Sequence, residues 1–410
     1  MSMLRHLPRL LSTPPKPPCR IIGPGPGLRR RTSTSTSTIS HARPSDPLRI
    51  LFCGSDAFSC AALRALHAEH VRRRHLVEAL EVMVLPGRRM GRGLKVLRQV
   101  PCQILAQELG LRVHERETFR GWDLPPGTNL VVVVSFGLFV PLRILSSAKY
   151  GGVNVHPSLL PDLRGPAPIH HALLRGDTHM GISLQTLDPK AFDHGTILAQ
   201  TPAPGFPIPP SASLQTVMQE AAARGAEMLV QGLRDGLHVP PHRDVGWKAA
   251  QLQAKGAETL QHAPKITKAD GRIDPDWTAE QFARRIRVLG SVWTTAVLHG
   301  SGSRKRVLLL DAEPVSISLE TEVEKQKEAG NEQQGTLVCE YADEHGSPSH
   351  RHERRVRIAR DGACLIHARD TAWVRVSKVK VDGKPEQMAA TGLRAFLRPG
   401  GSDRISSTGT

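Results

Sequence analysis

The strongest constraint on the fold is a run of four valines inside "NLVVVVSFGLFVP", residues 129–141. Successive side chains of a β-strand point to opposite faces, so an unbroken β-branched run requires a strand that is covered on both sides. Such strands are typical of parallel sheets with helices packed on each face. The run therefore predicts an α/β domain around it.

The segments before the valine run alternate between strand-like and helix-like patterns. The apolar runs "LRILFCG" and "LVEALEVMVL" are each followed by a helix-like stretch, "DAFSCAALRALHAEH" and "PCQILAQELG". This alternation predicts a Rossmann-like, doubly wound and mainly parallel sheet. The first turn, "CGSDAFS", has one glycine where a dinucleotide fingerprint needs three, so we expect neither NAD nor FAD.

The carboxy-terminal part has a different pattern. A helix that we expect to be capped by Ser211 and a polar linker come first, and then "TAEQFARRIRVLG" predicts one helix before six short apolar runs. Short strands at close spacing predict an antiparallel β-barrel, which we expect to be OB-like. We expect the acidic stretch from Glu320 to Glu344 to be a loop insertion. The predicted organisation is a leader at 1–45, a catalytic domain at 46–237, a linker at 238–261, the barrel at 262–398 and a tail at 399–410.

The first 45 residues contain eight Arg or Lys and no Asp or Glu, and they include the tract "RRRTSTSTSTIS". This composition is typical of a mitochondrial transit peptide, which places the protein in the matrix; a disordered basic tail is the alternative. The chain carries a net charge of +17, and about +9 remains without the leader. That excess favours a polyanionic partner. No apolar run is long enough to span a membrane, so we expect no membrane association, and we expect a monomer.

The cysteine and histidine patterns do not indicate a metal. The six cysteines form no Cys-x-x-Cys pair, so neither a disulfide framework nor a zinc site is expected. The cluster "HRHERR" at residues 350–355 lies among arginines, and we interpret it as a solvated loop.

Asn154 and His156 stand two residues apart in "GGVNVHP", so on a strand they share one face while Val153 and Val155 share the other. An amide beside an imidazole can stabilise an oxyanion and relay a proton. A strand-end histidine bonded to a loop carbonyl is the alternative. Asp193, in "FDHG", could hold the imidazole in one tautomer, although an Asp-x-Gly sequence alone indicates only a turn.

The stretch "NVHPSLLPDLRGPAPIHHAL", together with "FDHG", closely resembles the formyltransferases that use 10-formyltetrahydrofolate. The shared mark is Asn-x-His-x-Ser-Leu-Leu-Pro followed at a distance by Asp-x-Gly. "GRGLKV" and "APKITKADGRIDPDW" narrow the resemblance, over residues 49–398, to the methionyl-tRNA formyltransferases, and the leader to their mitochondrial form. The resemblance implies transfer of a formyl group from this folate to the α-amine of initiator methionyl-tRNA, without a metal.

The resemblance also implies roles for particular residues. Asn154, His156 and Asp193 would be the catalytic set. Ser158, Leu159, Leu160 and Pro161 would form the folate-binding loop, a rigid apolar wall for a flat heterocycle. The basic stretch "LPGRRMGRGLKVLRQV" would be a mobile loop that enters the tRNA acceptor stem, with these contacts: Arg88, Arg89, Arg92 and Lys95. The barrel stretch "RHERRVRIAR", with Lys378 and Lys380, would follow the phosphate backbone.

The chain departs from the family pattern in three places. Ser135 replaces a small residue after the valine strand, Asp162 and Leu163 stand where a basic or polar residue and a Trp are common, and no Pro follows Trp293. These changes affect the expected rim of the pocket. Two alternative functions remain. One is a folate-dependent transferase or hydrolase acting on a small molecule, and the other is a non-catalytic mitochondrial RNA-binding protein.

Overall fold

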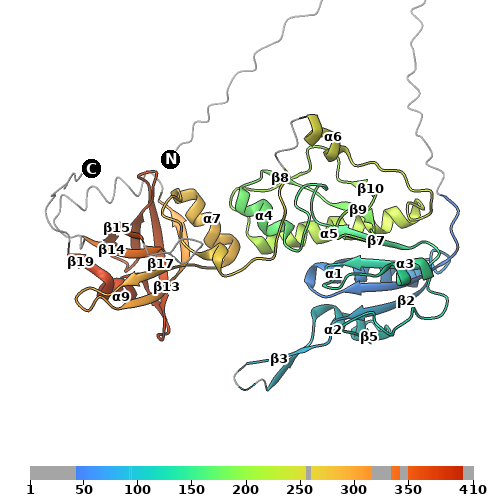
Figure 1. Ribbon diagram of the computed structural model, residues 1–410, viewed down its shortest axis with the longest axis horizontal. Coiled ribbons are helices and arrows are strands. Elements are labelled where there is room, and N and C mark those ends of the chain that lie inside the picture. Colours follow the sequence, from blue (N-terminus) through green and yellow to red (C-terminus); the bar gives the residue numbers. More distant parts are fainter. Residues whose placement is uncertain are drawn as a thin grey trace, which may run out of the picture. The chain divides into compact units, whose positions relative to one another are not determined.

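The computed structural model describes residues 43–91, 93, 95–254, 260–315, 334–341 and 350–399 (Figure 1). Most of the predicted leader, the predicted tRNA contact Arg92, most of the acidic stretch and nearly all of the tail lie outside the described residues.

A seven-stranded sheet forms the amino-terminal half, in the order β10-β9-β7-β6-β1-β2-β5. The five strands from β7 to β5 are mutually parallel; β9 pairs antiparallel with β7, and β10 pairs antiparallel with β9. The bounds are β1 (Leu48–Gly54), β2 (Val77–Val84), β5 (Val113–Glu115), β6 (Leu130–Val134), β7 (Gly152–His156), β9 (Ser183–Thr186) and β10 (Ile197–Gln200). The predicted mainly parallel α/β sheet is confirmed.

Helices cover both faces of this sheet, as the valine run requires. Val132 and Val134 of β6 pack into the core that includes α1 and α5, whereas Val131 and Val133 pack into the core that includes α3. All five β6 residues are buried. The helices are α1 (Ala57–Arg72), α2 (Pro101–Glu108), α3 (Leu142–Ser147), α4 (Pro168–Arg175) and α5 (Leu214–Arg234).

The ends of α1 and α5 are held by specific polar groups. Asp56 caps α1 by accepting the backbone N–H of Ser59. The cap of α5 is Ser213 and not the predicted Ser211, because the Ser213 hydroxyl accepts the N–H of Thr216 at 3.1 Å. The buried carboxylate of Glu69 on α1 also pairs with both arms of Arg234 on α5.

The chain entering β1 and the chain leaving α5 are joined by hydrogen bonds. Arg43 donates from its guanidinium to the carbonyl oxygens of Val239 and Pro241, at 3.0 and 2.6 Å. The hydroxyl of Ser45 lies 3.0 Å from Nε2 of the buried His238. The last residues of the predicted leader therefore contact the folded domain.

The basic stretch after β2 is a β-hairpin and not an irregular loop. Strands β3 (Arg88–Met90) and β4 (Val96–Arg98) pair antiparallel, with Arg88 opposite Arg98. Gly91 and Gly93 adopt positive φ angles of 81° and 76° in the turn. A second small sheet joins β8 (His179–Met180) and β11 (Phe206–Pro207).

The carboxy-terminal strands form a closed antiparallel barrel. The sheet order is β12-β13-β17-β16-β15-β14-β19, and β12 also pairs with β14, which closes the ring. The strands are β12 (Val292–Val297), β13 (Arg304–Pro314), β14 (Gln334–Tyr341), β15 (His350–Ile358), β16 (Cys364–His367), β17 (Trp373–Val381), β18 (Glu386–Met388) and β19 (Leu397–Pro399). Helix α7 (Ala279–Leu289) precedes them and α9 (Ala389–Leu393) precedes β19. The predicted barrel is confirmed.

The expectation of a solvated loop at "HRHERR" is wrong, because these residues lie in β15. The stretch pairs with β14, and the residues of β15 that follow it, from Val356 to Ile358, pair with β16, so the stretch is part of the barrel wall. None of the helices in the described ranges is long and apolar enough to cross a membrane.

The linker is more ordered than its composition indicates. It contains α6 (Trp247–Ala254), whose Trp247 ring N–H donates to the carbonyl of Thr201 at 2.8 Å. Beyond α6, His262 forms a parallel bridge with Arg164, in the loop that follows β7. The linker thus returns to the loop that carried the sequence signature.

Candidate active site

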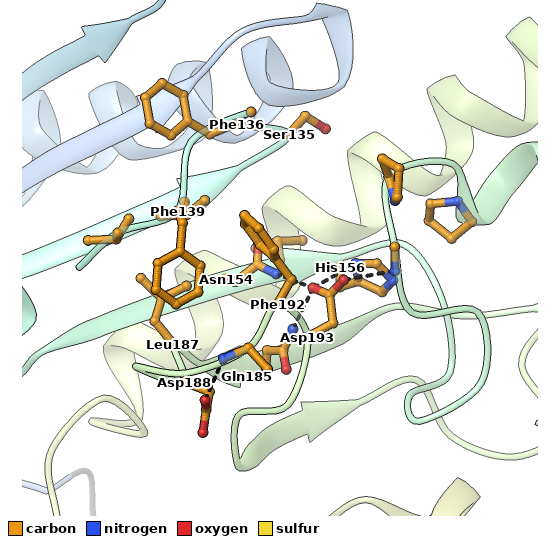
Figure 2. A pocket seen from close by; sticks show the side chains of 18 of the residues that line it. Ser135, Phe136, Phe139, Asn154, His156, Gln185, Leu187, Asp188, Phe192 and Asp193 are labelled. Atoms are coloured by element: carbon orange, nitrogen blue, oxygen red, sulfur yellow. Dashed lines mark hydrogen bonds and ion pairs between the residues drawn. The ribbon is translucent and has the colours of Figure 1, made fainter. Parts of the chain in front are cut away.

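Asn154 and His156 lie at the carboxyl end of β7 on one face of the sheet. Val153 and Val155 belong to the core on the opposite face, as the alternation predicted. The neighbouring strand β9 places Gln185 opposite Asn154 and Ser183 opposite His156. Figure 2 shows the polar side chains converging on Asp193.

The carboxylate of Asp193 is the centre of this cluster. Its Oδ1 accepts the amide N–H of Asn154 at 3.2 Å and that of Gln185 at 3.1 Å, and it lies 3.3 Å from Nδ1 of His156. Its Oδ2 accepts the backbone N–H of Gly165 at 2.9 Å. The side chain is 10 % exposed. Four polar groups around its two oxygens hold the carboxylate in one orientation.

Each ring nitrogen of His156 faces an acceptor. Nδ1 lies 3.3 Å from Asp193, and Nε2 lies 3.0 Å from the carbonyl oxygen of Leu163. A ring protonated on both nitrogens donates to both acceptors, whereas a neutral ring can donate to only one. The alternative considered for this residue, a bond to a loop carbonyl, therefore coexists with the bond to the carboxylate.

The backbone around the cluster is strained. Asp193 has a φ of 58° and Leu163 a φ of 56°, in the left-handed region that residues with a side chain seldom adopt. At Leu163 this conformation accompanies the carbonyl that faces His156. Asp tolerates the left-handed region better than most residues, which fits the choice of a carboxylate at position 193. Such strain concentrates at functional sites.

A cavity of about 380 Å³ opens beside the polar cluster. Asn154, His156, Gln185 and Asp193 form its polar side. Its apolar side comes from the loop after β6 and the loop after β9, namely Phe136, Leu138, Phe139, Val140, Leu187 and Phe192. The rings of Phe139 and Phe192 meet edge to face at 5.1 Å, on the side facing the polar cluster (Figure 2). The cavity can hold a flat heterocycle against a reactive polar edge.

The predicted folate-binding residues Ser158, Leu159, Leu160 and Pro161 are not among the residues that line this cavity. The side chains of the first three are buried, and the Ser158 hydroxyl donates to the carbonyl of Asp162. Ser158 and Leu159 instead border a separate, polar pocket. The apolar lining of the cavity comes instead from the phenylalanine-containing segments after β6 and β9.

Gln185 is a member of the site that sequence reasoning missed. It is 1 % exposed, donates to Asp193, and accepts the N–H of Gly195 with its side-chain oxygen at 3.2 Å. One signal existed, since Gln185 is a lone amide in the apolar strand "GISLQTL". Its position opposite Asn154, however, depends on strand pairing that sequence spacing does not give.

The predicted tRNA contacts are separate from this cavity. Arg88 and Arg89 on β3 and Lys95 before β4 are exposed and do not line it. Like charges directly opposite each other, as at Arg88 and Arg98, oppose strand pairing and favour an anionic ligand. Arg92 lies outside the described residues.

The basic barrel stretch does not act as one surface. Arg354 is 8 % exposed, and its guanidinium donates to the carbonyls of His367 and Pro275, each at 2.8 Å. This arginine braces the barrel, so its inclusion in a backbone-binding stretch is wrong. Arg355, Lys378 and Lys380 are exposed. Within the described ranges, no group of three or more His, Cys, Asp or Glu side chains could hold a metal ion.

The parallel sheet, the signature loop and the Asp193 cluster lie within residues 48–233, which match the family described as Formyl transferase. The mitochondrial methionyl-tRNA formyltransferase of Bos taurus is 34 % identical over 255 residues, which cover 62 % of this chain and 60 % of the relative. The methionyl-tRNA formyltransferase of Ehrlichia chaffeensis is 32 % identical over 268 residues, 64 % of this chain and 80 % of that protein. The chain belongs to the methionyl-tRNA formyltransferase family.

A solved structure with a similar fold, HypX from Aquifex aeolicus in complex with tetrahydrofolic acid, is 17 % identical and has a TM-score of 0.46. The match covers 86 % of this chain and 48 % of that one. At that score the structural likeness adds nothing to the relationship seen in the sequences.

Proposed function

We propose that the protein transfers the formyl group of 10-formyltetrahydrofolate to the α-amine of methionine on initiator methionyl-tRNA, in the mitochondrial matrix. The observation that carries the proposal is the Asp193 carboxylate, which holds Asn154 and His156 at the edge of an apolar cavity. The family relationship supports the same reaction.

The folate co-substrate fits the cavity by chemistry and by size. Its flat bicyclic ring suits the wall of Phe136, Phe139 and Phe192, and its formyl group would reach the polar edge. The folate supplies an activated formyl carbon. We assign Ser158–Pro161 to bracing the strand end beneath that edge instead of direct contact with the folate, because none of them lines the cavity and Ser158, Leu159 and Leu160 are buried.

The polar cluster then stabilises the charge that develops on the formyl oxygen when the amine attacks. Asn154 donates one amide hydrogen to Asp193 and keeps the other for the oxyanion. His156 is held by Asp193 on one side, and its Nε2–H bond to Leu163 can be shared with the oxyanion when the substrate is bound. Asp193 fixes both donors in place.

The tRNA would be bound by the exposed cations of the β3–β4 hairpin and of the barrel. Arg88, Arg89 and Lys95 project from a narrow two-stranded element that can enter a groove or reach a helix end. Arg92, in the same segment, is proposed to act at the acceptor end. These contacts would position the charged 3′ end without reading sequence.

The remaining organisation is part of the same proposal. Residues 46–237 form the catalytic domain, 262–398 the tRNA-binding barrel, and the protein acts as a monomer. Because Arg43 and Ser45 contact the region after α5, we place the end of the removed leader before Arg43. The import signal would then lie within residues 1–42.

The test is formyl transfer by the full chain from 10-formyltetrahydrofolate to charged initiator tRNA, compared with glycinamide ribonucleotide and with water as acceptors. Formylated methionyl-tRNA as the sole product supports the proposal. Transfer to the small molecule, or hydrolysis alone, would identify the rival folate enzyme. Tight tRNA binding without any transfer would identify a non-catalytic RNA-binding protein.

A further inference from the structure

The amine must lose a proton during the reaction, and the two central titratable groups of the cluster are poorly placed to take it. Both oxygens of Asp193 already face the donor groups of Asn154, Gln185, Gly165 and His156, so neither oxygen is left open toward the amine. Both nitrogens of His156 already face partners, Nδ1 facing Asp193 at 3.3 Å and Nε2 facing the carbonyl of Leu163 at 3.0 Å, so neither is open toward the amine. A different proton acceptor is needed.

The cavity lining contains two further titratable side chains, Asp188 and His262. Asp188 accepts the backbone N–H groups of Lys190 and Ala191 with one oxygen, at 2.7 and 2.9 Å. These bonds hold the pKa of its carboxyl below the usual value, which makes it a weak base. His262 is exposed and its ring makes no hydrogen bond to another described residue. A ring nitrogen of this imidazole that has no hydrogen-bond partner among the described residues has a lone pair that can accept a proton.

His262 is held at the cavity by backbone bonds on both sides. The N–H of Leu163 donates to the carbonyl of Gln261 at 2.8 Å, and the N–H of Ala263 donates to the carbonyl of Arg164 at 2.7 Å. The ring lies against Gly165, where a β-carbon would come within 2.6 Å of it. Gly165 is also the residue whose N–H holds Asp193. A single glycine therefore separates the His262 ring from the catalytic carboxylate.

We propose that His262 is a further catalytic residue that takes the proton from the attacking amine, directly or through one water molecule. This inference rests on the proposed function. The amine nitrogen bonds to the formyl carbon, and the bond from that carbon to N10 of the folate breaks. His156 supplies the proton that N10 receives, and the proton on His262 restores His156 through water. No proton is gained or lost overall.

The test compares His262→Ala, His262→Gln and a matched control, His171→Ala, in the full chain. His171 is a half-buried histidine whose Nε2 lies 2.9 Å from the carbonyl of Pro264, so it contacts the same linker without lining the cavity. We expect both His262 variants to lower kcat by about 10²-fold, the lower end of general-base effects, with an unchanged KM for the folate. The control should retain its turnover.

Rescue of turnover by added imidazole distinguishes a residue that accepts the proton from one that only supports the loop. Imidazole should restore much of the kcat of His262→Ala, because the exposed mouth admits a small base, and less of that of His262→Gln, whose side chain fills the space. Wild-type turnover in the His262 variants would overturn the inference. So would an equal, imidazole-insensitive loss in His262→Ala and His171→Ala, which would indicate that the linker only supports the loop. A wild-type protein inactive on charged tRNA would refute the proposed function and the inference with it.

Discussion

Gly195 lies so close to Thr186 that a β-carbon on Gly195 would come 1.7 Å from the Thr186 carbonyl oxygen. Thr186 is the last residue of β9, so its backbone is held by the sheet. The glycine two residues after Asp193 is therefore needed for close approach of two backbones, and this approach aligns the Gly195 N–H with Gln185. The relationship explains why an Asp-x-Gly sequence accompanies the amide of Asn154 and the imidazole of His156.

Replacing Gly195 with Ala should displace the Asp193 loop. We expect a loss of about 1–3 kcal/mol in the free energy of unfolding, since the added methyl has no space, together with a large loss of turnover. Denaturant unfolding measures the first and formyl transfer the second. Gly137→Ala is the stability control, because the nearest atom to its β-carbon is a Leu85 methyl at an ordinary 3.5 Å. Equal stability of both variants would contradict the steric argument.

Replacing Asp193 with Asn keeps the left-handed backbone conformation, which Asn tolerates, but removes the charge and turns one acceptor into a donor. The new NH₂ group would oppose the donors around it. We expect turnover to fall by about 10²-fold or more while folate affinity changes little. Single-turnover kinetics and folate titration separate the two effects. A variant that loses folate affinity and keeps its turnover would show that Asp193 only lines the cavity.

Replacing His156 with Ala should lower kcat by about 10²–10⁴-fold, because it removes an oxyanion donor and a proton relay. The ring is 5 % exposed, so some destabilisation is expected as well. Circular dichroism and the melting temperature establish that the variant is folded before kcat is compared. Near-normal turnover in a folded His156→Ala protein would remove this residue from the mechanism.

Substituting the hairpin cations should weaken tRNA binding without changing the chemistry. Arg88→Ala and Lys95→Ala should each raise KM for charged tRNA and reduce the slope of log affinity against log salt by about 1. Folate affinity should stay the same, because neither residue lines the cavity.

Arg92→Ala should lower the rate of formyl transfer to initiator tRNA more than the rate of transfer to a mimic with a mismatched first base pair. An equal loss of rate with both substrates would show that Arg92 is only an electrostatic anchor.

His238 should make the stability of the catalytic domain depend on pH. Burial, followed by the nearby charge of His242, lowers its pKa to about 4 in the folded protein, against an ordinary value near ~6.5. Between these values the unfolded chain binds the proton and the folded one does not, so stability falls as the pH drops from about 6.5 to about 4, by up to about 3 kcal/mol. Urea unfolding across this range measures the slope. His238→Gln should flatten it; an unchanged slope would assign the effect to other groups.

Sequence patterns determined the elements and their faces. The valine run requires a strand covered on both sides, and the alternation at residues 153–156 puts Asn154 and His156 on the face away from the α1–α5 core. The close spacing of the carboxy-terminal strands indicated a barrel. These predictions succeed because the periodicity of exposed and buried side chains is local in the chain and needs no knowledge of neighbours.

Only the tertiary structure decided which distant residues meet at the site. Gln185 faces Asn154 through pairing of β7 with β9, and His262 reaches Gly165 because the linker returns to the catalytic loop. Ser158, Leu159 and Leu160 are buried, and the guanidinium of Arg354 donates its hydrogen bonds to backbone carbonyl oxygens. The sequence had indicated a binding surface at both places. Contacts between residues far apart in the chain depend on how elements pack, and no local pattern of residue types records that packing.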